Sequence, residues 1–139
     1  MRSIAALFSM LMPGVGQMYN NQFVKGVVFL IIEHYDNVFG SINKAIHLDF
    51  NGAHAEALKA VDYQHLLFYP GFYAFCVWDA WFHARAGADK TKTAIIFLVG
   101  GFLGEFAAIF STHLPIPSLT CGLVMVIPML AGMFIFRKQ

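Results

Sequence analysis

Two long apolar segments limit the folds open to this chain more than any other feature of its sequence. They are residues 93–113, TAIIFLVGGFLGEFAAIFSTH, and residues 118–136, SLTCGLVMVIPMLAGMFIF. A third segment, residues 63–85, is less purely apolar and is rich in aromatic side chains. About 20 apolar residues in a helix cross the roughly 30 Å hydrocarbon core of a bilayer. These segments therefore predict three membrane spans.

The composition supports a membrane protein over the whole chain. Of its 139 residues, 58% are hydrophobic and only 12% are charged, whereas a soluble domain carries about 25% charged residues. A soluble protein of this length has too little interior to bury so much apolar surface. We expect one polytopic all-α domain, residues 1–139, built as a bundle of about five hydrophobic helices. The formal net charge of +1 gives no electrostatic reason to expect nucleic-acid binding.

The N-terminal part, residues 3–39, is harder to assign. Its two runs, residues 3–19 and 23–39, are each hydrophobic, short and interrupted. They can form two full spans, or a short helical hairpin that enters only part of the membrane. The first run lacks the small-residue cleavage site of a signal peptide, so we expect it to be retained. Residues 40–62 form the long polar segment, with a turn at Asn51-Gly52 and a short helix after it.

The cationic residues predict the orientation of the spans. Lys and Arg concentrate in cytoplasmic flanks, and they occur in the loop at residues 85–92 and at the C-terminal pair Arg137-Lys138. Both should be cytoplasmic, which places the uncharged turn at residues 114–118 and the polar segment outside. Five spans then place the N-terminus outside. Only Arg2, a positive residue that favours the cytoplasmic side, is against this placement. A hairpin of partial depth would place the N-terminus elsewhere.

Three acidic residues lie within the predicted spans. Ionisable groups in a membrane are costly and mark functional or packing sites. Glu33 lies toward the outer end of the second run, and Asp79 lies near the inner end of the third span, between two tryptophans. Glu105 is in the middle of its span. It either carries a proton or binds an ion, or it forms a hydrogen bond to a neighbouring helix or a partner protein.

Glycines beside Glu105 favour the packing interpretation. Gly100, Gly101 and Gly104 give that span a small-residue face, and Gly100 with Gly104 forms a GxxxG pattern that lets helices approach closely. For Asp79, the surrounding WDAWFHAR reads as an interfacial anchor, with Arg85 or water to satisfy the carboxyl group, or as a specific helix contact.

No pattern for catalysis or cofactor binding occurs in the sequence. It has no GxSxG, HExxH, CxxC or GxxxxGK[ST] motif, so an enzyme has no sequence support. The His and acidic residues of the polar segment are interpreted as a solvated loop rather than a metal site. The methionines repeated every four residues in the last span are interpreted as packing. We expect no metal and no cofactor.

The strongest local motif is a turn within the N-terminal part, PGVGQMYNNQ, followed by Lys25-Gly26. Proline interrupts a helix, glycine permits unusual backbone shapes, and the amide side chains can bond the backbone groups so freed. The motif predicts a turn between two short helices near the cytoplasmic face, with a docking surface as the functional alternative. The residues concerned are Pro13, Gly14, Gly16, Gln17, Tyr19, Asn20, Lys25 and Gly26.

The run PGVGQMYNNQFVKG resembles the hallmark PGxGQxYN, followed shortly by KG, of small bacterial membrane proteins related to the two-transmembrane-helix domain family. Many such proteins also have a later span that ends in Asp-Ala, an aromatic residue and then a small residue. Here that sequence is Trp78-Asp79-Ala80-Trp81, with Ala84 beyond it.

The resemblance covers only residues 3–26 and 73–84. The chain departs from the family by Asn21, where glycine is frequent, and by Trp81, where tyrosine is frequent; it also adds the polar segment and the last two spans. The resemblance implies a protein of the bacterial inner membrane. It implies no activity and carries over no catalytic residue, because family members largely lack an assigned function.

Three functions are compatible with the sequence. The first is an accessory, assembly or stabilising subunit that binds a larger membrane complex, which fits the small size and the lack of a catalytic set. The second is an oligomeric ion- or proton-coupled transporter or channel, in which copies of Glu105 form a ring of carboxyl groups. The third is a membrane enzyme that acts on lipid. The expected partners are the bilayer and either another membrane protein or further copies of this chain.

Overall fold

The structure, a computed structural model, describes residues 1–138. These residues form eight α-helices and a single 3-10 turn, with no strand, so the all-α prediction is confirmed. In chain order the helices are α1 (Arg2–Leu11), α2 (Val15–Tyr19), α3 (Phe23–Gly40), α4 (Ile42–Phe50), α5 (His54–Ala60), α6 (Tyr63–His83), α7 (Lys90–Ile109) and α8 (Pro117–Ile135), with the 3-10 turn at Ser111–His113.

The first predicted run is divided into α1 and the short α2. With ten residues at 1.5 Å each, α1 is about 15 Å long, half the thickness of a bilayer core. The chain turns at Pro13 and at Gly14, whose φ of 102° lies in the region that favours glycine. A Cβ on Gly14 would also lie 2.3 Å from the carbonyl oxygen of Gly26 in α3. Residues 3–19 therefore make a tight hairpin whose first helix is too short to be a full span.

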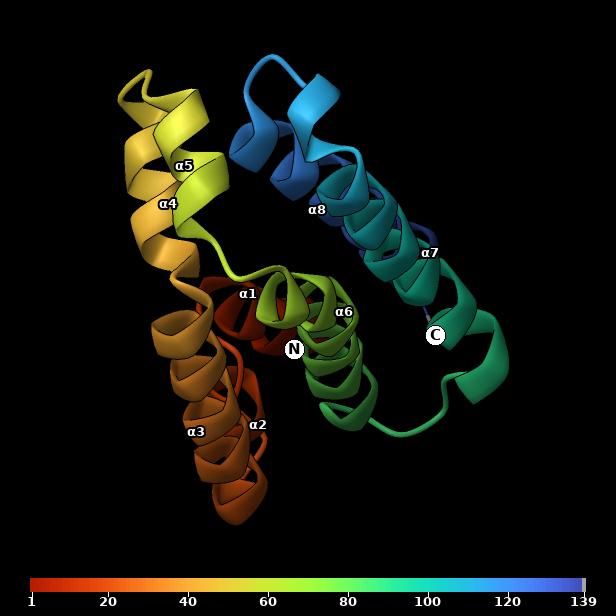
Figure 1. The fold of residues 1–139 in the computed structure, drawn as a ribbon. Helices are drawn as coiled ribbons and strands as arrows, with labels where there is room; N and C mark the ends of the chain where they lie inside the picture. The colour runs from red at the N-terminus through yellow and green to blue at the C-terminus, as the bar shows by residue number, and fades with distance from the viewer. Residues whose placement is uncertain (139) are drawn as a thin grey trace.

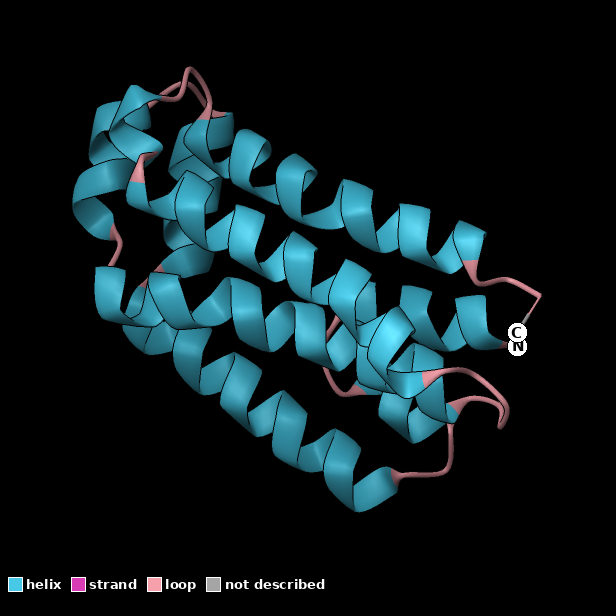
Figure 2. Cartoon of the chain, turned by 90° about the vertical axis from the view of Figure 1, so that its right-hand side faces the viewer, coloured by secondary structure: helices cyan, strands magenta, loops and turns pink. Residues whose placement is uncertain are grey.

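Helix α6 is the centre of the molecule, because α1, α3 and α7 all pack against it, and α8 packs on α7 (Figure 1). The core between α6, α7 and α8 includes Val77, Trp81, Phe97 and Met129, all almost fully buried. Figure 2 shows the N-terminus and the C-terminus at the same end of the bundle. The rings of Trp81 and Phe136, 6.3 Å apart, connect α6 to the chain after α8 at that end.

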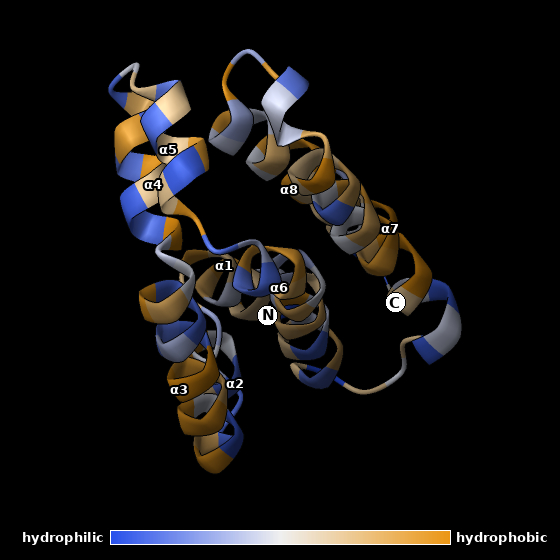
Figure 3. Ribbon diagram, in the orientation of Figure 1, coloured by the Kyte–Doolittle hydropathy of each residue, from blue (hydrophilic) through white to orange (hydrophobic). Residues whose placement is uncertain are grey.

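Two helices among the described residues, α7 and α8, are long and apolar enough to cross a membrane. In their most apolar stretches only 33% and 22% of the residues are buried, unlike the core helix of a soluble protein. Helices α3 and α6 reach a similar length, 18 and 21 residues, but are less apolar. Figure 3 shows hydrophobic residues along α7 and α8 and hydrophilic residues in α4 and α5.

The polar segment contains two helices where the sequence predicted one. Helix α3 ends at Gly40, and Ser41, with a φ of 53°, redirects the chain directly into α4. Gly52, with a φ of 83°, turns the chain at the predicted Asn51-Gly52 position. Helices α4 and α5 pack together as an antiparallel pair beside α8 (Figure 1).

Candidate functional site

The two sequence motifs meet in a buried polar cluster, formed by Ser9, Gln17, Lys25 and Asp79. Gln17 is completely buried. Its Nε2 donates to the carbonyl oxygen of Cys76 at 2.8 Å and to Oδ2 of Asp79 at 3.0 Å, and its Oε1 accepts from Oγ of Ser9 at 2.9 Å. One amide side chain therefore joins α1, α2 and α6, with its donor group and its oxygen both in use.

Asp79 also pairs with a cation from α3. Nζ of Lys25 lies 3.1 Å from Oδ1 of Asp79, and Nδ1 of His83 lies at the same distance from that oxygen. The Asp79 side chain is only 5% exposed, whereas Lys25 and His83 reach the surface. The sequence left two interpretations of Asp79 open, an anchor satisfied by Arg85 or water and a specific helix contact. The structure shows a helix contact, because Lys25 of α3, 54 residues away, pairs with Asp79.

Asn20 attaches the hairpin to the last turn of α6, and Arg2 attaches it to the loop that follows α6. Nδ2 of Asn20 donates to the carbonyl oxygen of Ala80 at 2.7 Å. Nη2 of Arg2 donates to the carbonyl oxygens of Arg85 and Ala86, in the loop just after α6, at 2.7 and 2.9 Å. The guanidinium group also lies 4.6 Å above the ring of Trp81. Sequence reasoning treated Arg2 only as a topology signal and missed this role.

The other motif residues shape the hairpin. A Cβ on Gly16 would lie 2.2 Å from the carbonyl oxygen of Ala5, so α1 and α2 approach each other more closely than alanine allows. A Cβ on Gly26 would similarly contact Met18 at 2.5 Å. Tyr19 is exposed and packs its ring on Phe8, 5.3 Å away. The motif therefore encodes a connector between short helices that is bonded to α6.

No family model, curated protein or solved structure matches this chain. The resemblance of PGVGQMYNNQFVKG to the two-transmembrane-helix domain family stays a prediction.

The two remaining acidic candidates have different surroundings. Oε1 of Glu33 accepts a hydrogen bond of 2.6 Å from Asn37, one turn further along α3. Glu105 is half-buried on α7, and within residues 1–138 it forms no hydrogen bond or ion pair. Its Oε1 would lie 3.2 Å from a Cβ on Gly71, so the carboxyl group occupies space that this glycine leaves free on α6.

The three glycines near Glu105 lie at contacts between helices. A Cβ on Gly100 would lie 2.6 Å from the carbonyl oxygen of Met125 in α8. A Cβ on Gly101 or Gly104 would contact α6, at 3.2 Å from Ala74 and 2.9 Å from Pro70. Helix α7 therefore uses its small residues within the chain, against both neighbouring helices.

Sequence reasoning missed two buried pairs at the opposite end of the molecule. Asp36 is 3% exposed, and its Oδ1 lies 2.8 Å from Nδ1 of His65, which connects α3 to α6. Asp49 is 1% exposed and bonds both Nδ1 of His54 and the backbone N–H of Ser118, the latter at 2.6 Å. The sequence interpretation treated Asp49 as part of a solvated loop. His65 is 29 residues from Asp36 and Ser118 is 69 residues from Asp49, so no local pattern marks these two contacts; His54 is only five residues from Asp49.

The Asp49 carboxylate is held in its charged form. Burial acts to raise the pKa of Asp49, but the hydrogen bonds from His54 and Ser118 outweigh burial and lower that pKa below its usual value of 3.8. Ser118 is in the first turn of α8, where a negative charge also complements the helix dipole. Asp49 thus fastens the α4–α5 pair to the start of α8.

The chemistry available to these groups is limited. In the part of the chain that the structure describes, no three His, Cys, Asp or Glu side chains are arranged to hold a metal ion. The polar cluster pairs its carboxylate with an ammonium group and an amide, which suits helix attachment rather than proton transfer. Glu105 is the intramembrane candidate whose carboxyl group is still open to a further partner.

Proposed function

We propose that this chain is an integral membrane accessory subunit that binds a larger membrane protein through the outer face of α7, with Glu105 at the contact. The observation that carries the proposal is the Glu105 carboxyl group, which has no partner among residues 1–138. A carboxyl group in hydrocarbon is costly unless a polar group pairs with it. A donor from a partner protein would satisfy Glu105 and fix the register of the contact.

The membrane placement in this proposal has α3, α6, α7 and α8 as four crossings and the α1–α2 hairpin inserted to half depth. Arg2 contacts Arg85 after the end of α6, Lys25 contacts Asp79 in the last part of α6, and the other Lys and Arg residues apart from Lys44 and Lys59 are in the loop before α7, in the first turn of α7 or after α8. These segments lie at the end of the molecule that holds both chain ends (Figure 2). The positive-inside rule then puts that end in the cytoplasm. This arrangement replaces the five-crossing expectation with an even number of crossings and a cytoplasmic N-terminus.

The surface around Glu105 supports a protein contact within the bilayer. Phe102, Leu103, Phe106 and Ile109 on the same helix are all exposed. Soluble monomers rarely expose so continuous an apolar surface, and in a bilayer such a face meets either lipid or another helix. Glu105 lies at the edge of this face, with its carboxyl group beside Gly71 of α6, and lipid tails cannot satisfy that group.

The transporter alternative requires polar groups that converge along a path. Within residues 1–138, Asp79 is already bonded to Gln17 and Lys25, and Asp36 to His65. Glu105 lies between α6 and α7, away from the polar cluster. A single chain therefore offers no continuous path, and a pore would need several copies of Glu105 in a ring.

The test is purification of the tagged full-length protein from native membranes in a mild detergent, with the mass and composition of the purified species measured. The proposal predicts a stoichiometric larger membrane protein in the complex. Glu105→Ala should lose that protein while its own yield and monomer mass stay unchanged, and Glu105→Gln should retain part of it. Glu56→Ala, at an exposed acid of α5, is the matched control. A pure homo-oligomer or a lone monomer would overturn the accessory role.

A further inference from the structure

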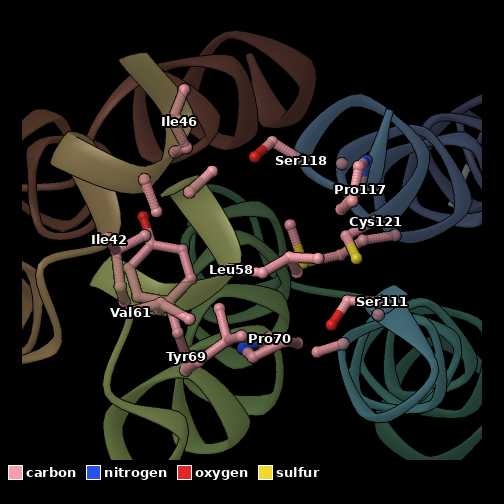
Figure 4. Close-up of a pocket in the computed structure, with 17 residues that line it drawn as sticks. Ile42, Ile46, Leu58, Val61, Tyr69, Pro70, Ser111, Pro117, Ser118 and Cys121 are labelled. Carbon is pink, nitrogen blue, oxygen red and sulfur yellow. The ribbon is translucent and has the colours of Figure 1, made fainter. Parts of the chain in front are cut away.

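An apolar cavity of about 130 Å³ lies where the α4–α5 pair meets α6, α7 and α8 (Figure 4). Figure 4 shows Ile42 and Ile46 of α4 on one side of it and Pro117, Ser118 and Cys121 of α8 on the other. Leu58 of α5 extends across the space between them. The cavity belongs to the opposite end of the molecule from the polar cluster and shares no residue with it.

Small residues create the cavity. Ala45, Ala57, Ser111, Cys121 and Gly122 line it together with larger apolar side chains. A Cβ on Gly122 would meet no atom within 4 Å, in contrast to the closely packed Gly100 and Gly132 on the same helix pair. There is therefore empty space beside Gly122 of α8, whereas the α7–α8 contact at Gly100 and Gly132 is closely packed.

The cavity has the properties of a hydrocarbon site rather than a water site. A buried water needs two to four polar partners, and the polar side chains of the lining are the hydroxyl groups of Tyr69, Ser111 and Ser118. Ser111 Oγ already lies 3.4 Å from the Tyr63 hydroxyl oxygen. Apolar cavities of about 150 Å³ stay dry and accept a benzene-sized molecule, so this volume fits the end of an alkyl chain.

We propose that this cavity receives the end of an acyl chain from a phospholipid of the surrounding bilayer. The proposal rests on the membrane placement given above but not on the accessory role. Helices α7 and α8 present exposed apolar side chains such as Phe110 and Leu119 outward and line the cavity with their other faces. Acyl chains are thus the apolar molecules at the highest local concentration. The hydrogen bonds of Asp49 to Ser118 and His54 hold the α4–α5 pair against α8, where it forms one wall of the cavity.

The two native cysteines can report whether the cavity is occupied. Cys121 lines the cavity and is partly exposed, whereas Cys76 is completely buried in α6.

The experiment follows the alkylation of these cysteines. The full-length protein is delipidated in a steroid-based detergent, whose rigid body does not enter so small a space. It is then titrated with dioleoyl-phosphatidylglycerol, and the rate of Cys121 alkylation by N-ethylmaleimide is followed by mass spectrometry of the peptides. Dihexanoyl-phosphatidylglycerol provides the same headgroup on short chains, and Cys76 reports any unfolding.

The proposal predicts that the oleoyl lipid slows Cys121 alkylation about tenfold at a concentration about ten times the half-protecting one. The short-chain lipid should protect far less. Gly122→Leu places a side chain in the cavity, so its Cys121 should react slowly without lipid and show no further protection. Leu123→Phe adds volume to the exposed face of the same helix and should behave like the native protein.

Unchanged Cys121 alkylation at saturating oleoyl lipid, with Cys76 still unreactive, would overturn the lipid site. So would protection of Cys121 only in the complex with a partner protein, because the cavity would then hold a side chain of that partner. Either result leaves the accessory role intact. Loss of the partner from Glu105→Ala is measured separately, so failure of one proposal does not mimic failure of the other.

Discussion

Gln17 shows how one side chain determines the path of the N-terminal part. An amide side chain offers donors and an acceptor in a fixed geometry, and Gln17 uses them on Ser9, Cys76 and Asp79. Without the amide, the Ser9 hydroxyl group would lose its acceptor and the Cys76 carbonyl oxygen a donor, while Asp79 would keep only Lys25 and His83. The requirement for glutamine at this position thus follows from three partners on two other helices.

Replacing Gln17 with leucine should destabilise the protein by about 2 kcal/mol, because a buried Asp79 oxygen and a buried backbone carbonyl group each lose a donor. Thermal unfolding of the purified protein in detergent measures the change. Gln64→Leu, at an exposed position of α6, is the matched control and should alter stability by less than about 0.5 kcal/mol. Equal effects of the two substitutions would contradict the role given to Gln17.

The Asp49 contacts predict a dependence of stability on pH. Because the pKa of Asp49 is lower in the folded protein than its usual 3.8, its contribution is complete at neutral pH and is lost as the pH falls below that value through the folded pKa. Stability should therefore decline in this acidic range. Asp49→Asn should be less stable at neutral pH and should show a shallower acid decline. Parallel acid profiles for the two proteins would exclude this carboxylate as the cause.

The sequence predicted which residue types form the hairpin turn but not their partners. Pro13, Gly14 and the amide side chains indicate an irregular connection with hydrogen bonds. The partner of Lys25 is Asp79, 54 residues later, and nothing local specifies that pairing. The contacts of Asp36 with His65 and of Asp49 with Ser118 were missed for the same reason.

At the scale of elements, the long helices and the short helix α5 were predicted, whereas α4 and the division of the first run into α1 and α2 were not. The predicted spans 63–85, 93–113 and 118–136 correspond to α6, α7 and α8 within a few residues at each end, because an apolar run of that length leaves little choice of structure. The depth of the first hairpin was left open. It depends on tertiary contacts, such as the hydrogen bond from the Tyr73 hydroxyl to the Met10 carbonyl oxygen.

Replacing Gly16 of α2 or Gly122 of α8 with alanine should change the stability of the protein in opposite directions. In Gly16→Ala the new methyl group would lie 2.2 Å from the Ala5 carbonyl oxygen, so overpacking should cost about 1–3 kcal/mol. In Gly122→Ala the methyl group enters open space, and the gain in helix propensity should stabilise the protein by about 0.5–1 kcal/mol. Unfolding midpoints of both variants in the same detergent provide the comparison. Destabilisation of both by similar amounts would contradict the packing described for Gly16.

At the scale of the whole molecule, the distribution of charged and apolar residues fits the proposed membrane placement. The cationic residues gather at the end that holds both chain termini, and the α4–α5 pair with its buried Asp49 forms the other end. Polar groups such as Gln17 and Asp79 are inside, and large apolar side chains such as Phe102 and Ile127 are outside. This distribution fits the membrane placement proposed above, in which hydrocarbon surrounds the long helices.

The orientation of the two chain ends tests this account most directly. Single cysteines are introduced at Asn51, Gly87 and Lys138, with a further cysteine added before Met1, in a background where Cys76 and Cys121 are alanine. A membrane-impermeant maleimide is applied to intact spheroplasts and to inverted vesicles. We predict that Asn51→Cys reacts only from outside and that the other three positions, including the N-terminal one, react only from the cytoplasmic side. An N-terminal cysteine that reacts from outside would mean five crossings and would contradict the half-depth hairpin.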